Sequence, residues 1–124
     1  MKELTKAEEQ LMHYLWDLEK AYLKEIVEQY PEPAPAYTTI STVVNVLVKK
    51  GFIGFDSHGK SRQYRPLVSK EKYTRQSVNG LMSSFFDNSA KKFASFFATQ
   101  DNLSVEELQE IRKLIDDQIA QRKS

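Results

Sequence analysis

The chain has 124 residues, of which 40% are hydrophobic and 28% are charged, and its formal net charge is +1. This length suits one domain or a small domain with an appendage, and the near-balanced charge excludes the unspecific nucleic-acid affinity of a polybasic protein. The sequence has no Cys, which excludes disulfides and thiolate chemistry, and we predict no metal site and no cofactor. Its charged start has no apolar run suited to a signal peptide or membrane span, so we expect a cytoplasmic protein without membrane insertion.

The first predicted element is a helix over residues 5–18. Thr5 and Glu8 have the spacing of a capping box, which predicts where the helix begins. Five apolar side chains recur every three or four residues and form its predicted buried stripe: Leu4, Ala7, Leu11, Leu15 and Leu18. Trp16 is interpreted as a core residue. His13 has no second ligand or acid-base partner at helical spacing and is interpreted as a surface residue.

A second, short helix is predicted over residues 23–29, with Ile26 and Val27 among its inward-facing side chains. Three alternating prolines follow, at positions 31, 33 and 35. Proline fixes φ and disfavours helix in the residue before it. We therefore predict a stiff connector that ends this helix and sets the direction of the next one.

The third predicted helix, over residues 37–50, has two contrasting faces. One is an apolar stripe at positions i, i+3, i+4 and i+7: Ile40, Val43, Val44 and Leu47. The other carries small hydroxyl and amide side chains: Thr38, Thr39, Ser41, Thr42 and Asn45. Such groups donate and accept hydrogen bonds at close range, which suits base edges and phosphates. Gly51, after Lys49 and Lys50, predicts the end of the helix.

A β-hairpin is predicted next, with strands over residues 52–56 and 62–65 joined by a loop over residues 57–61. Between residues 36 and 65, five basic residues stand against one acid: Lys49, Lys50, Lys60, Arg62 and Arg65 against Asp56. This local surplus favours a nucleic-acid surface. Lys49, Lys60 and Arg62 are the predicted phosphate contacts. An ordinary amphipathic helix followed by a surface hairpin would show the same periodicity.

Three amphipathic helices are predicted after the hairpin: one over residues 70–86, one around residues 93–97, and a last one opened by the capping box of Ser104 and Glu107. No sheet is predicted beneath their apolar faces, so we expect a second copy to complete their core. The alternative is that they fold back on the preceding domain. The predicted dimerisation residues are Leu81, Phe85, Phe86, Phe93, Phe96, Phe97, Leu108, Ile111 and Ile115.

The predicted fold class is mainly α with a small β-hairpin. Residues 1–68 are expected to form a winged helix-turn-helix DNA-binding domain, and residues 69–124 a helical dimerisation domain. A winged helix can also act as a protein-interaction module without sequence-specific DNA binding, although the basic Lys60 and Arg62 weigh against that alternative. No nucleophile has a base at a usable spacing and no phosphate loop is present, so we do not expect an enzyme.

Four segments resemble, in order and spacing, the penicillinase repressors of bacteria, the BlaI/MecI/CopY family: LTKAEEQLMHYLW, AYTTISTVVNVLVKKGFI, YRPLVSKEKY and LSVEELQEIRKLI. The resemblance covers essentially the whole chain. It implies a homodimeric winged-helix transcriptional repressor that binds an inverted-repeat operator in double-stranded DNA, commonly with TACA and TGTA elements. Many members have Arg in the last two turns of the recognition helix. This chain has Asn45 and Val46 there, which predicts a different operator.

The resemblance also implies control of β-lactam resistance genes through a membrane sensor-protease system that leads to cleavage within the dimerisation helices. Alignment through LSVEELQEIRKL places the family's Asn-Phe scissile pair at Phe96 and Phe97, so that Phe replaces Asn before the bond. The copper-responsive branch of the family uses a C-terminal Cys cluster, which this chain lacks.

Overall fold

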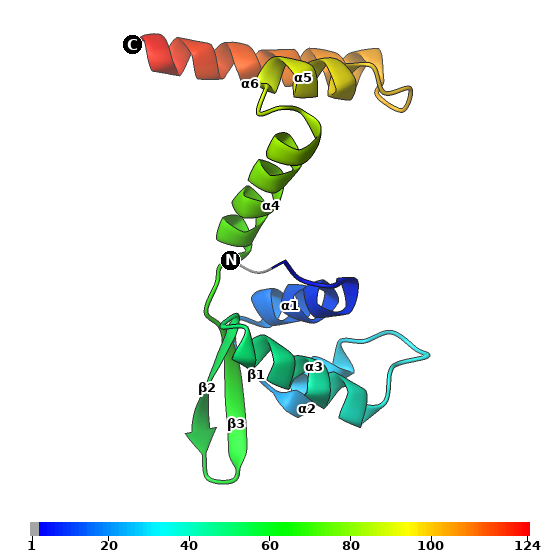
Figure 1. The fold of residues 1–124 in the computed structure, drawn as a ribbon, viewed down its shortest axis with the longest axis vertical. Helices are drawn as coiled ribbons and strands as arrows, with labels where there is room; N and C mark the ends of the chain where they lie inside the picture. The colour runs from blue at the N-terminus through cyan, green and yellow to red at the C-terminus, as the bar shows by residue number, and fades with distance from the viewer. Residues whose placement is uncertain (1–2) are drawn as a thin grey trace. The chain divides into compact units, whose positions relative to one another are not determined.

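The computed structural model describes residues 3–124 and divides into two compact units, Met1–Val78 and Asn79–Ser124 (Figure 1). The first unit contains α1 (Lys6–Leu18), β1 (Ala21–Tyr22), α2 (Leu23–Glu28), α3 (Tyr37–Lys49), β2 (Ile53–His58), β3 (Ser61–Pro66) and the first turns of α4 (Lys70–Phe85). The second contains the rest of α4, α5 (Ala90–Ala98) and α6 (Val105–Lys123). Among residues 3–124, no helix is both long and apolar enough to cross a membrane.

The beginning of α1 is the predicted capping box. The Glu8 amide donates to Thr5 Oγ1 at 3.2 Å, and the Thr5 amide donates to Glu8 Oε1 at 3.0 Å. The helix ends in a tight turn at Glu19, whose φ of 67° lies in the left-handed region, and the Lys20 amide there donates to the Leu18 carbonyl at 2.8 Å. A non-glycine residue at positive φ stores backbone strain.

The core of the first unit lies between its three N-terminal helices and the sheet. Its buried apolar side chains are Leu11, Met12, Leu15, Ala21, Ile26, Ile40, Val44, Leu47, Phe52, Ile53 and Tyr64. In α3 the predicted stripe is confirmed for Ile40, Val44 and Leu47, while Val43 is half-buried. In α1 the prediction was partly wrong, since Ala7 is exposed and Met12 is fully buried. The helix contacts both α3 and β3, so its buried face is turned from Ala7 toward Met12.

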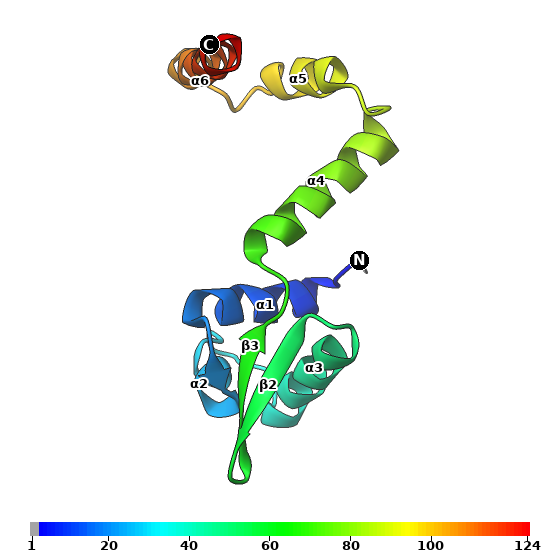
Figure 2. The same cartoon turned by 90° about the vertical axis from the view of Figure 1, so that its left-hand side faces the viewer.

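The sheet has three antiparallel strands in the order β1-β3-β2. The predicted five-residue loop was wrong, because the hairpin pairs as far as His58 and Ser61 and turns on Gly59 and Lys60 alone. Gly59 has a φ of 64°, as the first position of a tight type II′ hairpin turn requires. Both views show the hairpin tip extending beyond α2 and α3 (Figure 1 and Figure 2). The tip leaves the core, so its polar residues form strand without an apolar alternation.

The end of α3 has the predicted glycine cap. Gly51 has a φ of 84°, its amide donates to the Val48 carbonyl at 3.1 Å, and the Phe52 amide donates to the Leu47 carbonyl at 3.0 Å. These two bonds form a Schellman motif, which turns the chain directly into β2.

The start of α4 is attached to α1 by hydrogen bonds and aromatic contacts. Trp16 Nε1 donates to the Val68 carbonyl at 2.9 Å, and the Tyr73 hydroxyl donates to Glu9 Oε2 at 2.9 Å. The Tyr73 ring also lies 5.8 Å from the Phe52 ring, centroid to centroid. The division between the units therefore falls within α4, after Val78, whereas the sequence placed a boundary after residue 68.

The second unit has little core of its own, because no residue of α4, α5 or α6 is buried. Its closest packing is a group of phenylalanines. Phe86 lies 5.4 Å from Phe93 and 5.6 Å from Phe96, and Phe93 stacks on Phe97 at 5.8 Å. The predicted capping box at the start of α6 is present, with Ser104 and Glu107 bonded reciprocally at 3.0 and 3.1 Å.

Candidate nucleic-acid interface

The exposed face of α3 carries the small polar side chains singled out in the sequence. Because the opposite face packs into the core, Thr38, Thr39, Thr42 and Asn45 are exposed, and Ser41 is half-buried. The Thr42 hydroxyl donates its only hydrogen to the Thr38 carbonyl at 2.9 Å. Toward a ligand this hydroxyl can therefore act only as an acceptor. Asn45 keeps both an amide donor and an acceptor available to a ligand.

The hairpin contributes two exposed cations close to this face. Lys60 lies in the turn, and Arg62 follows on β3. The guanidinium carbon of Arg62 lies 4.3 Å from the centroid of the Phe55 ring, a cation–π contact that restricts the side chain. Phe55 is itself held against Tyr64, with 5.9 Å between the ring centroids. Arg62 is thereby positioned while its charge remains accessible.

Two other basic residues of this region have carboxylate partners. Lys50 Nζ lies 2.6 Å from Glu8 Oε1, and Arg65 Nη1 lies 3.3 Å from Asp56 Oδ2. The sequence count therefore overstated the available positive charge. Within residues 3–124, the three predicted phosphate contacts Lys49, Lys60 and Arg62 form no ion pair, so their charge remains available for an anionic ligand.

The ion pair of Glu8 and Lys50 joins α1 to the end of α3, and Glu8 is only 7% exposed. Burial alone raises the pKa of Glu8. The hydrogen bond and charge of Lys50, with the hydrogen bonds from Thr5, outweigh burial and hold the pKa of Glu8 below its ordinary value. Sequence reasoning missed this pair because 42 residues separate its members. A buried carboxylate with a fixed cation partner orients α3 on α1.

A groove of about 630 Å³ lies between α3, the start of α2 and the hairpin, and we call it the α3–hairpin groove. It brings together Ser41 and Asn45 from α3 with Lys60 and Arg62 from the hairpin. Its lining also includes residues that sequence reasoning did not select, among them Tyr22, Lys24 and Tyr37. Tyr37 stands in the first turn of the polar helix, which was a usable signal. No sequence signal pointed to Tyr22 or Lys24, since β1, whose pairing with β3 brings them beside the hairpin, was not predicted.

Five of the nine predicted dimerisation residues are exposed on the second unit. Leu81, Phe85, Phe96, Phe97 and Ile115 are between 39% and 76% exposed. The other four, Phe86, Phe93, Leu108 and Ile111, are half-buried.

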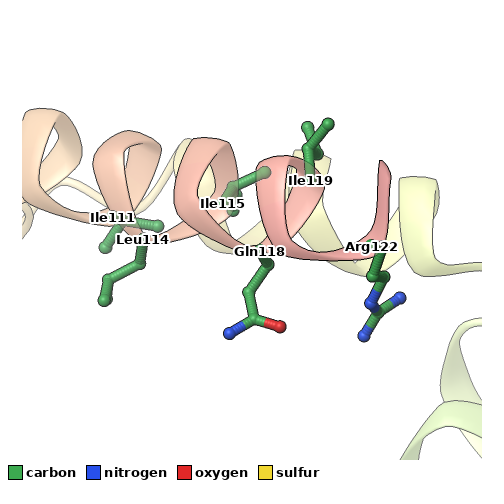
Figure 3. A pocket seen from close by; sticks show the side chains of 6 residues that line it. All are labelled: Ile111, Leu114, Ile115, Gln118, Ile119 and Arg122. Carbon is green, nitrogen blue, oxygen red and sulfur yellow. The ribbon is translucent and has the colours of Figure 1, made fainter. Parts of the chain in front are cut away.

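On α6 the apolar surface extends beyond the predicted residues. Leu114 and Ile119, which were not selected, are 65% and 46% exposed. Together with Ile111 and Ile115 they line one apolar groove along α6, and the polar Gln118 and Arg122 lie beside them (Figure 3). An apolar lining on a single exposed helix is typical of a surface that another helix covers.

The helical core, the three-stranded sheet and the hairpin that follows α3 together define a winged helix. The DNA-binding domain of the repressor BlaI has this fold and superposes with a TM-score of 0.51, at 23% identity, over 59% of this chain and 94% of that domain.

The family model described as penicillinase repressor matches residues 4–117, and the chain belongs to the penicillinase repressor family. The penicillinase repressor of Bacillus licheniformis is 21% identical over 116 residues, which cover 93% of this chain and 91% of that protein. The methicillin resistance regulatory protein MecI of Staphylococcus aureus (strain N315) is 24% identical over 115 residues, which cover 92% and 94%. One relative is named as a repressor and the other as a regulatory protein. The winged helix and the family resemblance predicted from the sequence are confirmed.

Proposed function

We propose that the protein is a transcriptional repressor that binds an inverted-repeat operator in double-stranded DNA as a homodimer. The observation that carries the proposal is the exposed polar face of α3 beside cations that have no carboxylate partner among residues 3–124. Membership of a family whose relatives are named as repressors supports the same conclusion.

In this proposal, the N-terminal part of α3 enters the major groove, where Thr38, Thr39, Ser41 and Thr42 face bases and phosphates. Asn45 offers the paired donor and acceptor that match the N6 and N7 edge of adenine. Lys49, Lys60 and Arg62 contact phosphates. A dimer would then make about six such contacts, which corresponds to a slope of roughly −5 in log K against log salt.

The second unit supports a dimer because it leaves its apolar surface uncovered. Helices that bury no residue do not provide a core, and large exposed apolar faces mark interaction sites. A second copy offers an identical surface, and two-fold pairing matches an inverted repeat. Each protomer binds weakly alone, so repression depends on the dimer.

Relief of repression would follow from damage to this second unit. Phe96 and Phe97, where the family's scissile pair aligns, are exposed and lie in the last turn of α5. The Phe96 carbonyl accepts bonds from Thr99 and Gln100 at 3.0 Å, so this turn must open before a protease can bind it. We propose cleavage here as the switch, driven by a membrane sensor-protease system and controlling β-lactam resistance genes. Because Phe96 stands where the family has Asn, a protease that cleaves this bond would have to accept Phe before it.

The deciding experiment is selection of bound sequences from a random DNA pool, with the oligomeric state measured by light scattering. We expect a palindrome and a dimer at micromolar concentration. Little binding to duplex DNA and no steep salt dependence would indicate a protein-interaction module instead.

Two variants then separate base reading from charge. Asn45→Ala should lose about 1 to 3 kcal/mol per half-site on the operator and little on random DNA. Lys60→Ala should weaken both equally. Equal losses on both DNAs for Asn45→Ala would contradict the assignment of base recognition to Asn45.

A further inference from the structure

The α3–hairpin groove has a third wall that the proposed DNA contacts do not use. Two walls carry residues already assigned to DNA, Asn45 on α3 and Lys60 with Arg62 on the hairpin. The third wall is the start of α2, represented by Tyr22 and Lys24, both exposed. Pairing of β1 with β3, in which Tyr22 lies opposite Gln63, fixes this wall relative to the hairpin. The Tyr22 ring also contacts His58 on β2, with 6.3 Å between the ring centroids.

The charges of the groove favour a polyanion. It is lined by three cations, Lys24, Lys60 and Arg62, and by one carboxylate, Glu25. Glu25 Oε1 accepts the backbone amide of Tyr22 at 2.8 Å, so this carboxylate is engaged by the backbone. Lys24 has no ion-pair partner among residues 3–124. Three cations with polar hydroxyl and amide groups between them match phosphodiester oxygens.

The form of the groove favours one strand of a duplex. With α3 in the major groove and the hairpin against the adjacent minor groove or its edge, the sugar-phosphate strand that separates the two grooves must pass between α3 and the hairpin. We propose that the α3–hairpin groove holds this strand and that Lys24, which lines the same wall as Tyr22, binds a phosphate from the side of α2. This inference rests on the proposed DNA binding and adds a third point of attachment to it.

Lys24→Gln tests the inference on a random-sequence duplex, with binding measured by fluorescence anisotropy across a salt series. Loss of one phosphate contact should reduce the slope of log K against log salt by about 0.9 per protomer, and the affinity about eightfold per protomer at 0.1 M salt. Lys6→Gln is the matched control, since it removes the same charge from an exposed position on α1 that does not line the groove. The control should leave the slope unchanged.

The possible outcomes separate this inference from the proposed function. If the unaltered chain shows no salt-dependent binding, both fail. If it binds with a steep slope that Lys24→Gln and Lys6→Gln leave equally intact, the DNA-binding proposal stands and the contact by Lys24 is overturned. Equal reductions in both variants would also overturn it, because they would show a general effect of net charge.

A second measurement locates the contact on the DNA. On the selected operator, single phosphates are replaced by uncharged methylphosphonates. At one position in each half-site, the replacement should weaken the unaltered chain but have no effect on Lys24→Gln, because the contact is already lost. If every position that weakens the unaltered chain weakens the variant by the same factor, Lys24 does not contact a phosphate.

Discussion

Replacing Lys50 by Met tests how strongly one buried ion pair stabilises the winged helix. Lys50 Nζ lies 2.6 Å from Glu8 Oε1, and the two side chains are 22% and 10% exposed. Met keeps much of the aliphatic length of Lys but none of its charge. The variant therefore leaves the Glu8 carboxylate buried without a cation, while its bond to the Thr5 amide remains.

The expected loss follows from the burial of the pair. Removal of one partner from a fully buried pair costs about 3 to 5 kcal/mol, whereas an exposed pair contributes about 0.2 to 1 kcal/mol. The pair of Glu8 and Lys50 lies between these limits, so we expect the free energy of unfolding to fall by about 2 kcal/mol. For a unit of this size, that corresponds to a Tm lower by roughly 8 to 16 °C.

Trp16 is the sole tryptophan of the chain and packs against Tyr73, so its fluorescence during urea unfolding reports the first unit. Arg65→Met is the matched control, because it breaks an exposed pair of 3.3 Å whose side chains are 46% and 64% exposed. That variant should change the free energy of unfolding by less than about 0.5 kcal/mol. Equal losses in the two variants would refute the role assigned to burial.

The pH dependence gives an independent check on the same pair. The pKa of Glu8 is lowered in the folded chain, so its stabilisation is present above the ordinary value of 4.5 and is lost as the pH falls through the lowered pKa. In Lys50→Met, burial without the cation should raise the pKa of Glu8, so protonation should relieve the penalty as the pH falls. The stability difference between the two chains should narrow from pH 7 toward pH 3.5. A constant difference would contradict this account.

Three further predictions concern other parts of the chain. Glu19→Gly should raise the free energy of unfolding in urea titrations by about 0.5 to 1 kcal/mol, because the φ of 67° strains any side chain there, and an unchanged free energy would show that no strain is stored. Burial and a neighbouring tyrosine raise the pKa of Tyr30 to about 12. The stabilisation by neutral Tyr30 is therefore present below pH 10 and should be lost as the pH rises through 12. Urea titrations at about pH 9 and about pH 11.5 should show this loss in the unaltered chain and not in Tyr30→Phe. Ile115→Glu places a charge on a side chain that is 54% exposed in the protomer, so sedimentation should show a dimer affinity at least about tenfold lower, while the unfolding reported by Trp16 stays unaltered. An unchanged dimer affinity would exclude this face from the dimer interface.

Local rules predicted the ends of helices well. The capping boxes at Thr5 and Ser104 and the glycine cap at Gly51 depend on residues within a few positions of each other, and all three are present. The apolar stripe of α3 was equally predictable, because one side of that helix packs on a core and the other side is exposed. Family resemblance supported the winged helix that the third helix and the hairpin already predicted, since the order and spacing of its four segments are specific.

The hairpin was predicted in kind but not in register. Its outer half carries polar residues on both faces, so no alternation marks Ser57 or His58 as strand. The backbone conformation of Gly59 decides the turn, and cross-strand pairing then extends the ladder to the tip.

Sequence by itself therefore determined the helices, their caps, the polar face of α3 and the family. Tertiary structure alone decided which charges remain available: Lys50 has a buried partner 42 residues away, whereas Lys24 is brought beside the hairpin by the two-residue strand β1. The physical reason is that caps and periodic faces depend on neighbours along the chain. Ion pairs, edge strands and grooves depend on neighbours in space, which the folded chain brings together.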